Sequence, residues 1–421
     1  MKVKFIDLFA GLGGIRIGFE EACKELGMTP QCVFTSEIKK YAVEIYKNNF
    51  DNNDVYGDIT QINEKDIPDF DYLLGGFPCQ AFSVAGTRKG FKDARGTLFF
   101  DIARIIKEKE PNGFLLENVE GLVSHDKGRT LETILNILRK DLDYIVEWKV
   151  LNSSDFGVPQ NRKRIYIVGK KKESVSLENF TQKKTFFGNI LDKDFPPVET
   201  KFTKRLLEIY TPNELEGKSI KDKRGGKNNI HSWDLELKGK ISKDQKELLS
   251  TLLLERRKKK WAIIKNIKWM DGMALTLNEI HSFYSFLSKN ELKNMLNDLV
   301  DKKYLSYEHP KDLIDNVRVQ DQNKEKGYNI VTGKLSFEFH KILDKNGIAP
   351  AIVATEVNRF GVIDNNKIRR LTEKECLRLF GFPEWYSSNI ALSELYDLIG
   401  NTVVVPVIKA ISRRILKQPL N

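Results

Sequence analysis

Hydrophobic residues in the first 170 positions alternate between short continuous runs and longer stretches with helical spacing. Strands and helices that take turns at these lengths predict an α/β fold, a doubly wound sheet flanked by helices. Ligands of such sheets bind beyond the carboxyl ends of the strands, so the loops there form the predicted catalytic layer. The predicted strands are 3–9, 32–38, 71–77, 113–119 and 165–169, and the predicted helices are 15–26, 42–50, 98–109 and 131–138.

The alternation fails in the middle of the chain, where polar, basic and aromatic residues mix in irregular stretches such as KDKRGGKNNIHSW. Helical spacing then returns in IRRLTEKECLRLFGFPEWY and LYDLIGNTVVVPVIKAISRRIL. The pattern therefore predicts a first part of the main body at 1–184, a smaller inserted domain at 185–345, and C-terminal elements at 346–421 that fold back onto the body.

Charge sets the inserted segment apart. The chain has a net charge of +11, and residues 201–270 contain 19 Lys or Arg against 9 Asp or Glu, which is nearly the whole surplus. Concentrated positive charge is expected where a protein binds a polyanion, most often nucleic acid. Charge alone fits a solvated, lysine-rich surface equally well.

Composition excludes several classes of protein. Hydrophobic residues make up 41% and charged residues 30%, no apolar run approaches the roughly 20 residues of a membrane span, and the first residues do not resemble a signal peptide. A cytoplasmic protein with no membrane partner is predicted. The four cysteines form no CxxC pair and the five histidines no HxxxH spacing, so neither a metal site nor a disulfide framework is expected.

Three loops after the first strands carry polar or glycine-rich signals. FIDLFAGLGG runs from a strand into a glycine-rich turn and then a helix, and glycines there allow a ligand to approach the backbone closely. Glu37 ends the next strand, where a carboxylate accepts hydrogen bonds from ribose hydroxyls, and Asp58 is a candidate acceptor for an adenine amino group. Each carboxylate alone is more simply a helix cap or a surface charge. Together the three loops predict an adenosine-type cofactor site.

A cysteine, a carboxylate and two arginines are the candidate catalytic groups. Cys79 lies in GGFPCQAFSVAG, a polar loop bounded by glycines, where a thiolate nucleophile is favoured over a buried small hydrophobe. Glu117 follows the strand GFLL, and Arg162 and Arg164 alternate in QNRKR, so both arginines face one side of a strand. A carboxylate held by arginines in a dry pocket is a candidate acid or hydrogen-bond donor to a ring nitrogen.

Five motifs in fixed order now carry a resemblance. FIDLFAGLGG, GGFPCQAFSVAG, LLENVEGL, QNRKRIYIVG and LYDLIGNTVVV resemble the successive signature motifs of the DNA cytosine-5 methyltransferases of bacterial restriction-modification systems, and RRLTEKECLRLFGFP resembles the motif before the last. The resemblance covers roughly Lys2–Gly169 and Ala349–Ile411. It implies a Rossmann-like sheet that binds S-adenosylmethionine, yields S-adenosylhomocysteine and needs no metal, with 185–345 as the target-recognition domain.

The resemblance also implies a covalent mechanism. Cys79 adds to C6 of a flipped cytosine, Glu117 protonates or hydrogen-bonds N3, and Arg162 and Arg164 position the base and the carboxylate. Gln80, Ser83 and Arg88 are implied DNA contacts near the nucleophile, and Ser83 lies on the part of the loop expected to close over DNA. The implied cofactor-binding residues are Phe9, Ala10, Gly11, Leu12, Gly13, Gly14, Glu37, Ile38, Asp58, Ile59, Gly76, Pro78, Asn401 and Val403.

Physical arguments alone apply to the inserted domain. RGGKNNIHSW is the predicted base-reading loop, because Gly225 and Gly226 permit close backbone approach to DNA. ERRKKKW is the predicted phosphate contact, with an exposed helix face as the alternative. The donors that the reading loop supplies are Arg224, Lys227, Asn228, Asn229 and His231.

Residues 275–310 resemble a winged helix-turn-helix: a short helix, a turn capped near Ser288, a second amphipathic helix and the run KKYLSYE. One hypothesis is that the helix starting near Ser288 faces a groove of DNA. The competing interpretation, that these helices only support the reading loops, is favoured because Glu291, Asp298 and Asp301 would repel phosphate.

The predicted function is methylation of cytosine C5 within a short duplex DNA sequence, protecting host DNA beside a separately encoded restriction endonuclease. Methylation of transfer RNA is a second possibility, because some relatives share the motif set. A catalytically silent DNA-binding protein is a third, disfavoured by the intact Cys79, Glu117 and arginines. The chain has no heptad repeat, so a monomer is predicted, located in the cytoplasm with the nucleoid.

Overall fold

The computed structural model describes residues 1–50, 54–78, 98–222, 225–268, 272–314, 317–332 and 337–417. Contacts divide the chain into two units. The first comprises Met1–Lys193, Asp344–Asn358 and Leu371–Asn421, and the second comprises Asp194–Leu343 and Arg359–Arg370. Among the residues singled out above, Cys79, Gln80, Ser83, Arg88 and Arg224 lie outside the described residues.

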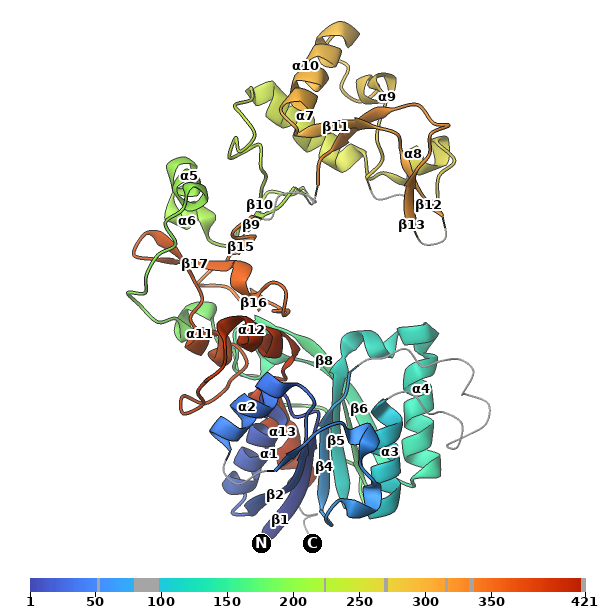
Figure 1. Cartoon of the computed structure of the whole chain (residues 1–421), viewed down its shortest axis with the longest axis vertical. Coiled ribbons are helices and arrows are strands. Elements are labelled where there is room, and N and C mark those ends of the chain that lie inside the picture. The colour runs from blue at the N-terminus through green and yellow to red at the C-terminus, as the bar shows by residue number, and fades with distance from the viewer. Residues whose placement is uncertain are drawn as a thin grey trace. The chain divides into compact units, whose positions relative to one another are not determined.

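The first unit is built on a sheet of seven described strands in the order β3-β2-β1-β4-β5-β8-β6 (Figure 1). Neighbouring strands from β3 to β5 run parallel, whereas β8 is antiparallel to both β5 and β6. Parallel neighbours place their carboxyl ends, and the loops that follow, at one edge of the sheet. The strands are β1 (Lys2–Leu8), β2 (Thr29–Ser36), β3 (Val55–Tyr56), β4 (Tyr72–Gly76), β5 (Gly113–Val119), β6 (Ile145–Asn152) and β8 (Lys163–Lys170).

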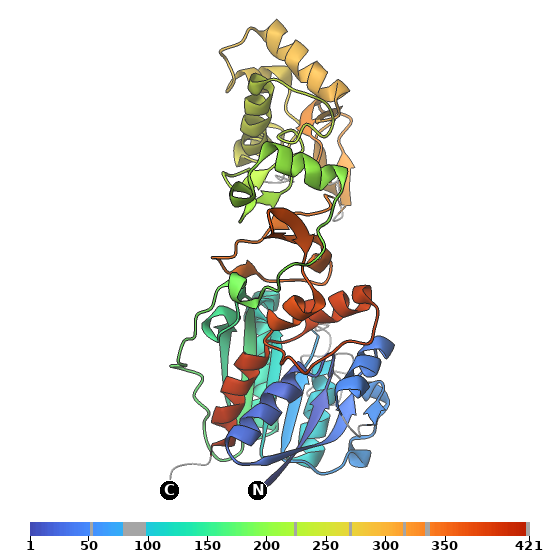
Figure 2. The ribbon, with the colours of Figure 1, turned by 90° about the vertical axis from the view of Figure 1, so that its left-hand side faces the viewer.

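Helices cover both faces of this sheet, with α1, α2 and α13 on one side and α3 and α4 on the other (Figure 1). The C-terminal α13 lies along α1 (Figure 2), and a Cβ atom on Gly18 would come within 2.8 Å of Ile408, so this close packing requires glycine. The helices are α1 (Gly14–Glu25), α2 (Lys40–Asn49), α3 (Leu98–Lys109), α4 (Arg129–Asn136), α11 (Glu373–Arg378), α12 (Leu392–Asn401) and α13 (Val405–Leu416). Of the helices described, none alone is long and apolar enough to cross a membrane, and α12 and α13 reach that length only together, across a 43° bend.

The predicted α/β fold class is confirmed, with each predicted strand and helix of the first 170 residues present to within a few positions. Three features differ from the prediction. Strands β3 and β6 were not predicted, and β8 runs antiparallel. The connection between β6 and β8 holds only a short turn (Ser153–Asp155) and β7 (Gln160–Asn161), whereas a parallel pair needs a crossover of a dozen or more residues.

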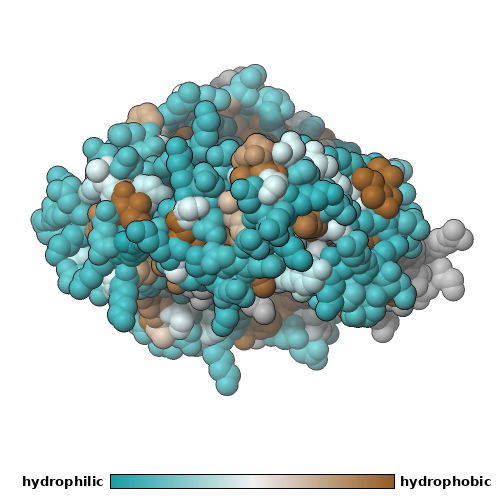
Figure 3. Space-filling view, turned by 90° about the horizontal axis from the view of Figure 1, so that it is seen from above, coloured by the Kyte–Doolittle hydropathy of each residue, from teal (hydrophilic) through white to brown (hydrophobic). Residues whose placement is uncertain are grey.

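The second unit contains two hydrophobic cores. One lies under the sheet β10-β9-β15-β17-β18, against α5 (Lys201–Ile209) and α6 (Pro212–Leu215). The other is shared by the helices and short strands between 243 and 330. The end of this unit at the top of Figure 1, seen from above in Figure 3, is predominantly hydrophilic. The remaining elements are β9 (Ser219–Ile220), β10 (Asn229–Ile230), α7 (Lys243–Glu255), α8 (Lys259–Ile264), α9 (Leu277–His281), α10 (Lys289–Asp301), β11 (Leu305–Glu308), β12 (Lys311–Ile314), β13 (Val317–Gln320), β14 (Gly327–Ile330), β15 (Lys341–Ile342), β17 (Phe360–Asp364) and β18 (Lys367–Arg370).

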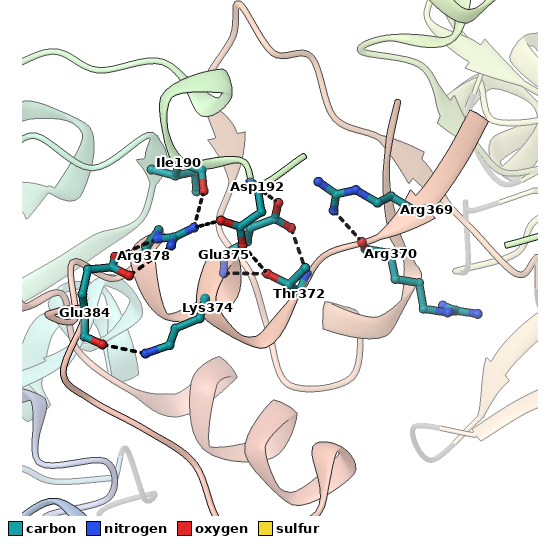
Figure 4. A network of polar contacts seen from close by, with 9 residues as sticks. All are labelled: Ile190, Asp192, Arg369, Arg370, Thr372, Lys374, Glu375, Arg378 and Glu384. Carbon is teal, nitrogen blue, oxygen red and sulfur yellow. Dashed lines mark hydrogen bonds and ion pairs between the residues drawn. The ribbon is translucent and has the colours of Figure 1, made fainter. Parts of the chain in front are cut away.

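The limits of the units differ from the predicted 184/185 and 345/346. Strand β17 pairs with β15 and with β18, so residues 359–370 belong to the second unit although they follow a return to the first. Residues up to 193 belong to the first unit. Figure 4 shows the reason: Arg378 of α11 donates to Asp192 at 2.7 Å and to the Ile190 carbonyl, and it also pairs with Glu384.

A buried polar network lies at the end of β1. Asp7 is 1% exposed, and its Oδ2 accepts a hydrogen bond from the Tyr46 hydroxyl at 3.1 Å. The same hydroxyl lies 3.2 Å from Arg16 Nη1. Burial outweighs the favourable field of Arg16 and raises the pKa of Asp7 to about 7. The second oxygen, Oδ1, has no hydrogen-bond partner, so ionisation of this carboxyl opposes folding.

We expect Asp7→Asn to flatten the pH dependence of stability. The unfolded chain ionises at the ordinary carboxyl pKa of about 3.9 and the folded chain only near 7, so wild-type stability falls as pH rises between these values, by on the order of 4 kcal/mol. Denaturant unfolding of both proteins at several pH values measures this difference. Asp69→Asn, at a side chain that is 93% exposed, controls for the lost charge. Parallel pH profiles for Asp7→Asn and wild type would contradict the expectation.

Candidate active site

The turn after β1 has an unusual backbone. Phe9, Gly11 and Gly13 have positive φ angles of 58°, 52° and 73°. Positive φ is unfavourable for a phenylalanine, and such strain persists where the surrounding structure enforces it, often at ligand sites. The Ala10 amide donates to the Ser36 carbonyl of the neighbouring strand, which holds the turn beside β2. At this edge of the sheet the turn therefore presents its backbone, rather than side chains, to a ligand.

A cavity of about 450 Å³ opens at the carboxyl ends of the parallel strands. Every predicted cofactor-binding residue except Gly13 lines it, and so do the predicted catalytic residues Glu117, Arg162 and Arg164. The structure thus brings together residues that are spread over most of the first unit. The cavity is also lined by residues that were not predicted to belong to the site, some of them within the quoted motifs. These are Ile15, Ser36, Lys39, Phe77, Leu98, Asn118, Val119, Leu398 and Thr402.

Gly13 has a packing role that the motif did not indicate. A Cβ atom at this position would lie 2.4 Å from the ring of Phe50, which packs against the turn from outside the cavity. Its positive φ also favours glycine. Gly13 is therefore required for the turn and for packing, and its direct contact with the cofactor stays a prediction.

The cavity has hydrogen-bond acceptors next to an apolar surface, and this combination suits an adenosine group. Glu37 Oε2 accepts from the Gly11 amide at 2.8 Å, and Oε1 accepts from the amides of Ile38 and Lys39. Each carboxylate oxygen has more than one lone pair, so the fixed carboxylate can still accept from ribose hydroxyls. The side chain of Ile38 is 69% exposed beside it, which leaves an apolar surface for a flat ring.

Glu117 is a buried acid with one arginine partner. It lies near the end of β5, and its Oε1 is 3.1 Å from Nε of Arg164, which faces it from the start of β8. Burial raises the pKa of Glu117, although Arg164 and Arg162 both oppose the shift. A raised pKa retains the protonated form, which can donate a proton or hydrogen bond to a ring nitrogen.

Arg162 contacts the protein backbone instead of the carboxylate. Its guanidinium donates to the carbonyls of Ile352, Gly400 and Thr402 at 2.9 to 3.0 Å. The residue is 2% exposed, and burial together with Arg164 lowers its pKa to about 10. These bonds hold the segment that contributes Thr402 and Val403 to the cavity wall. Arg164 therefore pairs with the carboxylate while Arg162 holds the backbone, a difference that their alternation in the sequence did not indicate.

Two buried amides were missed as site residues. Asn118 donates from Nδ2 to the Phe77 carbonyl at 2.9 Å, so it holds the chain immediately before Pro78 and the loop of Cys79. Gln160 bonds the Leu379 carbonyl and the Ile352 amide. Both belong to the quoted motifs ENV and QNRKR, and that was the only sequence signal for them.

The predicted reading loop in the second unit is only partly exposed. Lys227 and Asn228 are exposed between β9 and β10, and Asn229 begins β10 and is half-buried. His231 is 6% exposed and stacks on Trp233 with ring centres 4.4 Å apart, while its Nδ1 faces Asp234. This burial fits a packing role for His231, and its contact with a base stays a prediction.

Arg256, in the predicted phosphate-contacting run, is also buried. It is 4% exposed and donates from Nη1 to Asn329 Oδ1 at 2.6 Å. The run does not form one exposed helix face either, because α7 ends at Glu255 and α8 begins at Lys259. The lysines at 258–260 remain exposed. Among the residues described in both units, no group of three or more His, Cys, Asp or Glu side chains is arranged to hold a metal ion.

Comparisons with known proteins agree over the length of the chain. The family model of the C-5 cytosine-specific DNA methylases matches residues 3–417. The chain is 56% identical over 422 residues to the Type II methyltransferase M.NlaIV of Neisseria lactamica, covering 99% of each protein. It is 40% identical over 448 residues to the Type II methyltransferase M.BanI of Aneurinibacillus aneurinilyticus, covering 100% of this chain and 97% of that one.

Solved structures share the fold at low sequence identity. A DNMT2 mutant of Spodoptera frugiperda and the methyltransferase EhMeth of Entamoeba histolytica are each 16% identical, with TM-scores of 0.51 and 0.52, and each alignment covers 99% of this chain and 100% of the other. The resemblance given by the motifs is thereby confirmed. The chain belongs to the C-5 cytosine-specific DNA methylase family and is a DNA cytosine-5 methyltransferase of the Type II restriction-modification kind.

Proposed function

We propose that this enzyme methylates a cytosine flipped out of a short, specific duplex DNA sequence, through a covalent bond between Cys79 and C6. The observation that carries the proposal is the buried pair of Glu117 and Arg164, 3.1 Å apart, in the same cavity as the glycine-rich turn. Pro78, the residue before Cys79, lines that cavity too. An acid, a cofactor-type pocket and the start of the nucleophile loop are what this reaction needs together.

The covalent step answers a chemical difficulty, because C5 of cytosine is a poor nucleophile. The thiolate of Cys79 forms a bond to C6, the C5=C6 electron pair moves to form C4=C5, and the C4=N3 pair moves onto N3, which takes the proton of Glu117. N3 returns that proton to Glu117 as C5 gains the methyl group. A base then removes the C5 proton, and the electron pair left on C5 restores C5=C6 and expels the thiolate.

S-adenosylmethionine, on which this family and fold depend, supplies the methyl group and leaves as S-adenosylhomocysteine. The turn at Phe9 and Gly11, the carboxylate of Glu37 and the exposed Ile38 are the residues we assign to its adenosine part. Asp58, whose Oδ1 caps the turn at Thr60, is assigned to the adenine amino group. Residues Asn401 and Val403 complete the wall held by Arg162. The reaction requires no metal.

The second unit is the proposed target-recognition domain, and its basic segment at 201–270 favours duplex DNA over transfer RNA. Modification of that sequence would protect host DNA from a separately encoded restriction endonuclease of the same specificity. We propose that the enzyme works as a monomer in the cytoplasm, on nucleoid DNA.

Expression of the protein in a methylation-free bacterial host should convert cytosines in one repeated sequence context of a resident plasmid to 5-methylcytosine. Bisulfite sequencing detects these positions, and the Cys79→Ser variant, expressed at the same level, should yield none. Modified cytosines in the Cys79→Ser plasmid would exclude the covalent mechanism. An unmodified plasmid with modified transfer RNA would overturn the DNA substrate.

Glu117→Gln should lower kcat by roughly 100-fold or more, because an amide donates a hydrogen bond to N3 but no proton. The wild-type kcat should fall as pH rises through the raised pKa of Glu117, because the protonated acid is the active form. Measured by methyl transfer under saturating DNA and cofactor, this alkaline limb should be missing from the variant. An alkaline limb that persists in Glu117→Gln would assign it to another group.

Arg162→Lys and Arg164→Lys should affect different properties, namely stability and catalysis. Lysine cannot reach three carbonyls at once, so Arg162→Lys should lower the free energy of unfolding by about 3 kcal/mol and weaken cofactor binding through the displaced wall. Arg164→Lys should keep most of the stability and lower kcat. Melting curves and cofactor titrations of the matched pair test this division, and equal stability losses would argue against it.

A further inference from the structure

Residues 243–330 of the second unit have the topology of a winged helix-turn-helix. Leu275 and Tyr328 exchange both backbone hydrogen bonds, at 3.0 and 2.7 Å, and β14 pairs antiparallel with β11 on its other edge. The order along the chain is helix α7, the strand residue Leu275, helices α9 and α10, strand β11, the hairpin β12–β13 and strand β14. Gly327 permits this pairing, because a Cβ atom there would lie 2.4 Å from the Leu275 backbone.

One core joins these elements, so the winged helix is a packed body. Figure 1 shows α7, α9, α10 and β11 gathered together. Helix α10 turns one side toward that core, and the side chains on it are fully buried. The shared core includes Leu248, Leu252, Ile280, Leu292, Leu296, Leu299, Leu305 and Tyr328.

The opposite side of α10 carries residue types that bind DNA. Lys289, Asn290, Lys293, Asn294 and Asn297 are all exposed, and at 3.6 residues per turn they fall within an arc of about 140°. Asparagine makes paired hydrogen bonds to adenine, and lysine contacts phosphate or guanine. Val300, which is half-buried, is the one apolar residue of α10 that falls within this arc, and the end of the unit seen in Figure 3 is predominantly hydrophilic.

Three acidic residues of α10 were the reason to disfavour DNA docking, and two of them form hydrogen bonds or ion pairs with neighbouring residues. Glu291 Oε2 accepts from the amide and hydroxyl of Ser288, as the third residue of a capping box. Asp298 pairs with Lys302 at 2.6 Å and accepts from Gln245. Both lie on the flank of the Lys/Asn face rather than on it. Asp301 is exposed and falls within the arc of the Lys/Asn face, at the C-terminal end of the helix and about one turn beyond Asn297.

We propose that α10 is a second sequence-reading element, which enters the major groove of duplex DNA outside the methylated cytosine. Lys289 and Lys293 contact phosphates, and Asn290 and Asn294 contact base edges. A helix fits a groove about 12 Å wide. The inference rests on the proposed function, since it requires duplex DNA as the substrate, and it reverses the interpretation that these helices only support the reading loops.

Two double variants separate the two kinds of contact. Lys289→Gln with Lys293→Gln should weaken binding to specific and non-specific duplexes alike and reduce the slope of log Kd against log salt by about 2. Asn290→Ala with Asn294→Ala should weaken binding to the methylated sequence by roughly tenfold or more while leaving non-specific binding unchanged. Neither change lowers helix propensity seriously, so α10 should persist.

The matched control is Lys2→Gln with Lys4→Gln, at exposed positions of β1 in the first unit, at the end opposite to the cavity. This pair removes the same charge and should leave the salt slope at the wild-type value. Hydroxyl-radical footprints give an independent readout. The wild type should protect a segment beyond the target cytosine, and the asparagine variant should lose that protection.

Wild-type affinity, salt slope and footprint in both α10 variants would overturn the docking inference, provided that the wild type methylates the plasmid. Failure of the wild type to methylate or bind duplex DNA would instead overturn the proposed function. If a variant loses thermal stability, its binding data are set aside and the wild-type footprint tests the docking of α10. Protection limited to the bases around the target cytosine contradicts that docking.

Discussion

The parallel register of β2, β1, β4 and β5 is the constraint on which the site depends. It brings the glycine-rich turn, Glu37, Pro78 and Glu117 to one edge of the sheet, although these residues are spread over more than a hundred positions. The antiparallel β8 then serves a purpose. Because it runs the other way, its first residues lie at the edge where β5 ends, and Arg164 faces Glu117 from there. A parallel strand would have carried its arginine to the opposite edge.

Hydrophobic patterning and short motifs predicted most of this edge, because each motif is local and each strand delivers its own loop. The partners of Arg162 could not be predicted. They are backbone carbonyls 190 to 240 positions further along the chain, and a carbonyl has no residue type that a sequence could show. The packing of Gly13 and His231 could not be predicted for a related reason. The rings that they contact, those of Phe50 and Trp233, are brought close to them by the fold.

Burial does opposite things to the charged groups around the cavity. It raises the pKa of Glu117, which suits an acid, and it lowers the pKa of Arg162 to about 10, while three carbonyls accept hydrogen bonds from that guanidinium. Arg164 has one carboxylate partner and is left to hold the acid in orientation. Two arginines that are two positions apart thus have separate roles: Arg164 orients the protonatable Glu117, and Arg162 fixes the cavity wall.

The strand pairing of β17 and β18 with β15 has a consequence for how the second unit can be exchanged between proteins. The second unit is not one continuous insertion, because residues 359–370 rejoin it after Asp344–Asn358 have returned to the first unit. A recombination event that exchanged only Asp194–Leu343 would leave β15 of one ancestor facing β17 of another. The second unit can therefore be transferred with its strand pairing intact only if both pieces, Asp194–Leu343 and Arg359–Arg370, are transferred together.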